Sequence, residues 1–284
     1  MAIATLLQRE SINVVDYRCN AGPDDRPFPE QHRQYSISFV RRGSFGCHIE
    51  GEHYELVAGS VFIGHPGGEY LCTHDHHGCG DECLSFGLSA EVVDMIAGPQ
   101  RPLWRTRCVA PLPQLMIVGE LAQVIAAGNS DMALDEAGVL LAAKYIEVVS
   151  GQSRRSLRTH AQARRRAVEA AMWIDANSQH AIDFEQAARQ VGLSSFHFLR
   201  LFAAIIGVTP HQYLVRSRLR HAARLLADED RPITAVALDV GFNDLSNFVR
   251  TFHRAAGMSP RDFRRAARGD RRIFREMMAP AARA

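Results

Sequence analysis

The chain has 284 residues, of which 46% are hydrophobic and 23% are charged, and its formal net charge is +2. This length suits two domains of ordinary size. Residues 1–7 are apolar but too short, and without the basic flank, for a signal peptide, and no apolar run reaches the length of a membrane span, so the sequence predicts a soluble, cytoplasmic protein.

The small net charge conceals a division between two halves. Residues 151–284 contain 23 arginines and no lysine against 12 acidic residues, a net charge of +11, whereas residues 1–150 carry 10 basic and 19 acidic residues, a net charge of −9. Basic side chains supply affinity for nucleic-acid phosphates. The asymmetry therefore predicts a nucleic-acid-binding half joined to a half with another task.

Short strands with glycine-rich turns are expected over residues 1 to about 110. Residues 35–40 alternate between polar and apolar, and residues 42–46, with Gly43 and Gly46, are expected to form a turn. Further strands are expected at residues 47–49, 54–57, 60–63, 70–76 and 84–88. Short strands at regular spacing indicate a sandwich or a small barrel.

A cluster of cysteine and histidine residues follows the strand at residues 70–76. Cys72, His74 and His76 share one face of a strand, and Cys79 or Cys83 would return across a turn. Three or four such nitrogen and sulfur ligands suit a tetrahedral zinc ion, and soft thiolates also suit Cu(I). The spacing matches no standard zinc motif.

Three other interpretations of this cluster stay open. It would serve as a thiol redox sensor if the histidines raise thiolate reactivity, or as the polar floor of a pocket for a small organic effector. It would otherwise be a histidine-rich loop with buried structural cysteines. All six cysteines lie in the N-terminal half: Cys19, Cys47, Cys72, Cys79, Cys83 and Cys108.

Two helices and a linker come next. Helices are expected at residues 115–127 and 134–149, with apolar faces that suit packing on the strands and on a partner. A polar linker with the run Ser153-Arg154-Arg155-Ser156 follows. We divide the chain into a sensor domain at residues 1–150, a linker at 151–163, a DNA-binding domain at 164–268 and a tail at 269–284.

Residues 183–265 contain one helix-turn-helix pattern twice. The repeat offset is 49 or 50 residues for the pairs Ala188/Ala237, Gly192/Gly241, Phe198/Phe248 and Pro210/Pro260. The glycine ends the first helix of each unit, and Ser194 or Asn243 is expected to cap the second. Phenylalanines four residues apart face the core, so Arg200 and Arg250 point elsewhere, as a helix in the DNA major groove requires.

The segments from Leu193 to Phe202, Gly207 to Pro210 and Gly241 to Pro260 resemble the AraC/XylS family of bacterial transcription regulators. The resemblance covers roughly the last hundred residues. It implies an all-α domain of seven helices, in which two helix-turn-helix units are joined by one linker helix, residues 211–228, and read adjacent major-groove segments of double-stranded DNA.

Residues 57–68 resemble, less specifically, the strand-turn-strand of the cupin-like sensor domains that are common in this family. The resulting fold class is α+β, with an N-terminal cupin-like β-barrel and two helices. The His-x-His strand of metal-dependent cupin enzymes is missing. In relatives the helices after the barrel dimerise, so the resemblance implies a homodimer, and packing within one chain explains the same apolar faces equally well.

Helix direction and the family pattern together place the DNA-contacting residues. They are Ser195, Phe196, Leu199 and Arg200 in the first unit and Asp244, Ser246, Asn247, Arg250 and Thr251 in the second. Arginine suits guanine, asparagine suits adenine, and apolar Phe196 and Leu199 suit thymine methyl groups. The alternative is that Arg200 or Arg250 touches only phosphate.

These observations predict a transcription regulator without enzymatic activity. Its N-terminal half would sense a small molecule, a metal or the redox state, and activation through RNA polymerase follows from what is usual in the family. The alternative is a cupin-type metalloprotein or enzyme with a helical accessory domain. A DNA-repair protein with a similar helical domain is a further relative, but its zinc-binding cysteines come as two close pairs, which this chain lacks.

Overall fold

The structure is a computed structural model that describes residues 2–75, 78, 80–105, 108–128, 133–150, 161–228, 230–270 and 272–273. Most of the expected linker, residues 151–160, and most of the tail, residues 274–284, lie outside this range. No helix in the described part of the chain is both long enough and apolar enough to cross a membrane.

The N-terminal half is built on strands. They are β1 (Ala2–Gln8), β2 (Ile12–Cys19), β3 (Phe28–Gln31), β4 (Tyr35–Ile49), β5 (Glu52–Val57), β6 (Val61–Gly64), β7 (Glu69–Thr73), β8 (Asp81–Leu88) and β9 (Cys108–Val109). The main path of the sheet is β1-β2-β8-β4-β6-β9, and β3, β5 and β7 lie off this path. Its first and last strands do not pair with each other among the described residues, so the expected closed barrel is not confirmed.

Strand β4 corrects one sequence expectation. It runs without interruption through residues 42–46, so the predicted turn there is wrong. Gly43 has a φ of 71°, and the pairing with β8 shifts register between Val40 and Arg42. This bulge bends β4, which pairs with β8 and β6 in its first part and with β5 and β7 in its second.

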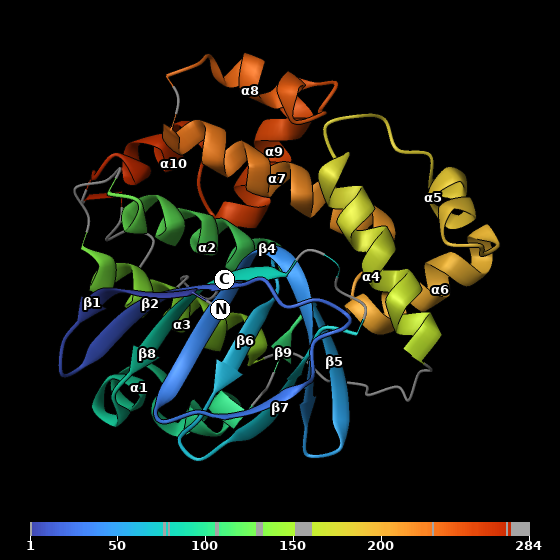
Figure 1. Cartoon of the computed structure of the whole chain (residues 1–284). Helices are drawn as coiled ribbons and strands as arrows, with labels where there is room; N and C mark the ends of the chain where they lie inside the picture. Colours follow the sequence, from blue (N-terminus) through green and yellow to red (C-terminus); the bar gives the residue numbers. More distant parts are fainter. Residues whose placement is uncertain are drawn as a thin grey trace.

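Helices cover one side of these strands (Figure 1). After β8 come α1 (Ala90–Ala97) and the 3-10 helix η1 (Gly98–Arg105), and after β9 come α2 (Pro113–Ala126) and α3 (Leu134–Val149). The sequence predicted α2 and α3 but missed α1 and η1, so the N-terminal half has more helices than expected. Both faces of α2 are buried, because it lies between the strands and the C-terminal helices (Figure 1).

The C-terminal half is helical. Its elements are α4 (Ala161–Ala176), α5 (Phe184–Gln190), α6 (Ser195–Ile206), α7 (Pro210–Asp228), α8 (Ile233–Asp239), α9 (Leu245–Ala256) and α10 (Pro260–Ala267). Helices α5 and α6 form one helix-turn-helix unit and α8 and α9 form the other, and Gly192 and Gly241, in their turns, have φ values of 66° and 94°. Helix α7 connects the two units (Figure 1).

The two halves share a hydrophobic core. One buried cluster contains Phe39 and Phe86 of the strands, Leu121 of α2, and Leu219 and Phe252 of the C-terminal helices. Helices α4 and α6 also pack on β5. Helix α7 is therefore held against the strand-bearing half from the side of α2, and the first helix-turn-helix unit from the side of β5 (Figure 1).

Candidate nucleic-acid interface and sensor pocket

Helix α9 presents a polar face to solvent. Phe248 and Phe252 are fully buried beneath it, and Asp244, Ser246, Asn247 and Arg250 are exposed, whereas Thr251 is half-buried. The Asp244 carboxylate accepts the backbone N–H groups of Ser246 and Asn247 and thereby caps α9. The expected cap, Asn243, is therefore wrong by one residue.

Two side chains fix the orientation of the Asn247 amide. Its Oδ1 accepts hydrogen bonds from Arg250 Nη2 at 3.2 Å and from Thr251 Oγ1 at 3.3 Å. Because the oxygen is engaged on the helix, the Nδ2 amide donor stays available for an outside acceptor. This side of α9 thus gathers hydrogen-bond donors over a rigid aromatic base.

Helix α6 is the equivalent element of the first unit. Phe198 and Phe202 are buried in it, as predicted, and Phe202 packs edge-on against Tyr213 of α7 with ring centroids 5.7 Å apart. Leu199 is 45% exposed, an unusual position for a large apolar side chain. The side chains of the other three predicted residues, Ser195, Phe196 and Arg200, lie outside the described part of the structure.

A buried ion-pair network joins α7 to α2. The Glu120 carboxylate of α2 lies 2.7 Å from Arg224 Nε and 3.5 Å from Arg220 Nε, both on α7. Glu120 and Arg220 are fully buried, and Arg220 also pairs with Asp175 of α4. Burial raises the pKa of Glu120, although the Arg224 and Arg220 charges oppose this rise.

Further hydrogen bonds and an ion pair join the two halves. Arg224 Nη2 donates to the Arg41 carbonyl at 3.1 Å, and Arg216 donates to the Pro111 carbonyl. On the β5 side, Arg164 Nε of α4 lies 3.2 Å from Glu55, a buried carboxylate. Arg164 is the first of three consecutive arginines on α4, and it contacts the N-terminal half.

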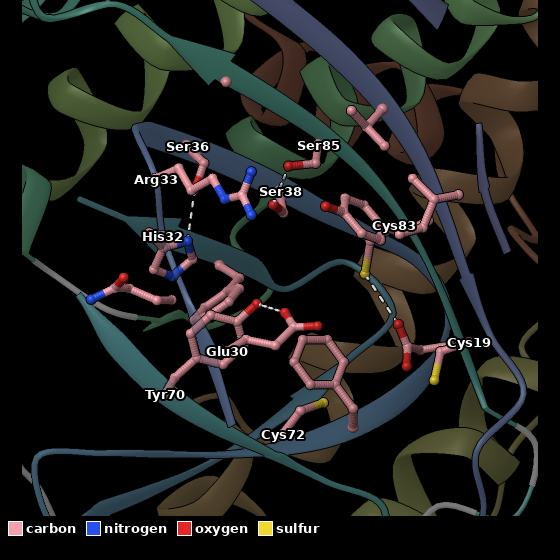
Figure 2. A pocket seen from close by; sticks show the side chains of 18 of the residues that line it. Cys19, Glu30, His32, Arg33, Ser36, Ser38, Tyr70, Cys72, Cys83 and Ser85 are labelled. Atoms are coloured by element: carbon pink, nitrogen blue, oxygen red, sulfur yellow. Dashed lines mark hydrogen bonds between the residues drawn. The ribbon is translucent and has the colours of Figure 1, made fainter. Parts of the chain in front are cut away.

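A cavity of about 620 Å³ opens among the strands of the N-terminal half (Figure 2). Tyr70 donates to the Glu30 carboxylate at its wall, and the His32 ring stacks on Tyr70 with centroids 4.7 Å apart. Burial, aided by His65, lowers the pKa of His32 to about 4, so this imidazole is neutral at pH 7. Ser38 of β4 donates to its neighbour Ser85 of β8 at 2.8 Å, and both side chains line the cavity.

Mixed polar and apolar groups converge on this space. Other lining residues are Asn13, Tyr17, Phe28, Arg33, Gln34 and Phe45. A concave site of this volume with a few placed polar groups has the form of a small-molecule pocket.

The predicted cysteine and histidine cluster lies at one end of the cavity. Cys72 and Cys83 line it, whereas His74, 2% exposed, is not among its lining residues. The ligand atoms that come close to His74 belong to Cys19 and Asp81, which the sequence analysis did not select. His76 and Cys79 lie outside the described residues.

Pairing between strands explains why Cys19 was missed. Cys19 ends β2 and lies directly opposite Asp81, the first residue of β8. The two positions are more than sixty residues apart in the chain, so only the register of the sheet brings them together. The one local signal was that Asp81 falls inside the cysteine and histidine segment.

The chemistry of the thiols disfavours the redox interpretation. Cys19, Cys47, Cys72, Cys83 and Cys108 are all buried. Burial raises the pKa of the Cys19, Cys47, Cys72 and Cys83 thiols. Reactive cysteines need a thiolate and access to solvent.

Comparison with known proteins points to one family. A family model described as a helix-turn-helix domain matches residues 187–266. The chain is 36% identical over 88 residues to a probable transcriptional regulator, LumQ, of Photobacterium leiognathi. The matched segment covers 31% of this chain and 36% of that protein. It is 24% identical over 253 residues to the HTH-type transcriptional activator RhaS of Shigella boydii, which covers 85% of this chain and 89% of that protein.

A solved transcriptional regulator with an AraC-type DNA-binding domain, from Chromobacterium violaceum, is 27% identical over 38% of this chain and 96% of its own, with a TM-score of 0.36. The chain thus spans about a third of LumQ and most of RhaS. The helix-turn-helix model matches the segment that contains both repeat units, α5–α6 and α8–α9. The chain therefore belongs to the AraC/XylS family of transcription regulators, and its C-terminal half carries the DNA-binding domain.

Proposed function

We propose that this regulator is a sequence-specific activator whose DNA binding responds to a small effector in the N-terminal cavity. The observation that supports this most is the Glu120 network, which ties α7, the helix between the two DNA-reading units, to α2 of the cavity-bearing half. A ligand that shifts the strands under α2 would change how α7 is held. The orientation of both helix-turn-helix units, which α7 connects, would then change together.

The proposal assigns the chain four parts. Residues 1–150 form the sensor and dimerisation domain, residues 151–163 the linker, residues 164–268 the DNA-binding domain and residues 269–284 the tail. The reading residues are Leu199, Asn247, Arg250 and Thr251 among those whose side chains are described, with Ser195, Phe196 and Arg200 in the first unit. Asp244 and Ser246 act at the start of α9, where Asp244 also caps the helix.

A homodimer would use α3 rather than α2. Helix α2 is covered on both faces, so it offers no partner surface, whereas Val139 and Ala143 of α3 are only half-buried. RNA polymerase would be contacted by the DNA-bound form, as in activators of this kind. RhaS, by its name, is a transcriptional activator, which supports activation rather than repression here.

The experiment selects bound sequences first, because the operator is unknown. Genomic fragments retained by the full-length protein are sequenced, and the enriched site is placed upstream of a reporter. We expect two adjacent sequence elements, one for each unit, and reporter activation that depends on a small molecule. Retention of fragments without a shared motif would contradict sequence-specific binding, and repression of the reporter would contradict activation.

Effector binding is tested separately on the cavity. Ser85→Phe places a large side chain in the cavity, at a position on β8 outside the DNA-reading helices, and Ser11→Phe, outside the cavity lining, is the matched control. Operator binding that responds to small-molecule pools should lose that response in Ser85→Phe and keep it in Ser11→Phe. A response unchanged by the filled cavity would place the effector elsewhere.

A further inference from the structure

The cluster at the end of the cavity has the spacing of metal ligands. His74 Nε2 lies 3.6 Å from Cys19 Sγ and 3.3 Å from Asp81 Oδ1, and the three atoms lie within 4.8 Å of one another. Around a tetrahedral zinc ion with ordinary bond lengths, a sulfur and a nitrogen ligand are separated by roughly 3.6 Å, and a nitrogen and an oxygen ligand by about 3.3 Å. The two observed separations match two edges of such a tetrahedron, and the third, between sulfur and oxygen, is at most 4.8 Å.

Hydrogen bonding alone explains these contacts less well. One nitrogen, Nε2 of His74, faces both the sulfur and the carboxylate oxygen, and a neutral ring nitrogen carries at most one proton. The 3.3 Å separation from Asp81 is also longer than the usual N–H···O distance of about 2.9 Å. A cation shared by the three atoms satisfies all of them at once.

The surroundings hold these ligands in place. Cys19 and Asp81 are opposite partners across β2 and β8. Gly80, with a φ of 66°, lets the backbone approach so closely that an added Cβ would lie 2.0 Å from the Cys19 carbonyl oxygen. Cys83 Sγ donates to Asp81 Oδ2 at 3.4 Å, a contact drawn as a dashed line from Cys83 in Figure 2. The other carboxylate oxygen, Oδ1, is directed at His74.

We propose that Cys19, His74 and Asp81 form a binding site for a thiophilic divalent cation, Zn²⁺ in the first place, at the end of the N-terminal cavity. A thiolate, a carboxylate and a neutral imidazole balance the charge of the cation, so the site is neutral in a buried setting. Binding forms a metal–sulfur bond and releases the Cys19 thiol proton to solvent. Sulfur together with nitrogen selects zinc over magnesium or calcium.

The site is of the open kind. Cys19 and Asp81 both line the cavity, whereas His74 is buried and is not among the lining residues. Three protein ligands leave the fourth tetrahedral position of zinc to water or to an outside donor, and the cavity is on the side of two of the three ligands. Metal binding would thus place a Lewis acid at the wall of the space that we assign to the effector.

This site differs from the one that the sequence suggested. Cys19 stands in the place of Cys72, and Asp81 joins the set; His76 and Cys79 lie outside the described residues. Cys72 is consequently a matched control: it is a buried cysteine of the same half that lines the same cavity. A comparison of Cys19→Ser with Cys72→Ser therefore distinguishes the proposed ligand set from the one that the sequence suggested.

The test uses full-length protein purified under reducing conditions without an affinity metal and titrated with Co²⁺. We expect about one equivalent to bind, with a thiolate-to-cobalt charge-transfer band and intense visible bands of tetrahedral cobalt, all removed by added Zn²⁺. Cys19→Ser, which exchanges one atom, should lose the charge-transfer band. His74→Gln should weaken Co²⁺ binding at least tenfold, and Cys72→Ser should leave the spectrum unchanged.

Three outcomes would overturn the assignment: no tetrahedral spectrum in the unaltered protein, a charge-transfer band that survives in Cys19→Ser, or one that disappears in Cys72→Ser. Far-UV circular dichroism checks that each variant is folded. The spectra are recorded without DNA, so a failure of the metal site is distinct from a failure of regulation. Operator binding with and without Zn²⁺ then shows whether the cation changes regulation.

Discussion

At the scale of single residues, Arg250 and Asn247 carry the sharpest expectation about DNA reading. Both are exposed on α9 and joined by a 3.2 Å hydrogen bond. Asn247→Ala should weaken operator binding by about 1–3 kcal/mol and relax the preference at one base pair, since asparagine pairs with adenine edges. Binding to sequence-randomised operators measures both effects.

Arg250→Ala separates two roles of the arginine. If Arg250 reads guanine, the variant loses preference at one base pair; if it touches phosphate, affinity falls for all sequences and the slope of log K against log salt decreases by about 1. Arg254→Ala, on the same helix, exposed and outside the predicted set, is the control. Equal losses in Arg250→Ala and Arg254→Ala would argue against a special position for Arg250.

His32 links stability to pH at the same scale. Burial lowers its pKa from 6.5 to about 4 in the folded protein. The unfolded chain therefore takes up more protons between these values, and stability present above pH 6.5 is lost as the pH falls toward 4. Urea unfolding at about pH 7 and at about pH 4.5 measures how much unfolding free energy is lost on acidification. This loss should be smaller by about 2 kcal/mol in His32→Gln than in the unaltered protein.

His180→Gln, which replaces an exposed histidine of the C-terminal half, is the control for the substitution itself. His221 has the same lowered pKa, about 4, so part of the dependence remains in His32→Gln. An unchanged difference between the two pH values in His32→Gln would contradict a neutral, buried imidazole at the cavity wall.

At the scale of elements, the two halves of the chain were unequally open to prediction. The repeated glycine, phenylalanine and proline positions specified α5–α6 and α8–α9, because each unit is local in sequence and its turn requires a glycine at positive φ. The residue contacts that face DNA are still predictions. The cap of α9 was displaced by one residue because Asn243 and Asp244 are both good capping residues.

The strand-bearing half depended on long-range pairing. Gly43 and Gly46 are typical of a turn, yet β4 continues through them. The bulge lets this one strand pair with β8 and β6 in its first part and with β5 and β7 in its second. The Cys19 and Asp81 pair arises from the β2–β8 register. Neither feature has a local signature, so the sequence singled out Cys72 and His74, and only the strand register shows that Cys19 and Asp81 lie beside His74.

Helix α2 yields a prediction about the buried ion pairs. Glu120→Ala should destabilise the protein by about 3 kcal/mol or more, because it leaves the Arg220 charge buried beside only Asp175. Glu147→Ala, which breaks the exposed pair with Lys144 on α3, should cost under about 1 kcal/mol. Urea unfolding of both variants measures the contrast, and similar losses would mean that the Glu120 network adds little.

At the scale of the whole molecule, the two halves meet along two separate lines. One is the α2–α7 contact with Glu120, and the other is the contact of α4 with β5 through Arg164 and Glu55. The first contact holds α7, which connects the two helix-turn-helix units, and the second holds α4, which packs on the first unit. The relative position of the two units therefore depends on both contacts. Under the proposed function, a change inside the N-terminal half would reach the helix-turn-helix units through one or both of these contacts.

Arg224 tests this arrangement directly, because it is 37% exposed and can be altered with less damage to the core than Arg220. Arg224→Glu places a like charge beside Glu120 and should loosen the α2–α7 contact, whereas Arg224→Lys keeps one cation there. We expect a larger radius of gyration by small-angle scattering for Arg224→Glu only. Its operator affinity should also no longer respond to the effector, while Arg224→Lys retains the response. A loosened but still effector-responsive Arg224→Glu would show that the signal travels through α4 and β5 instead.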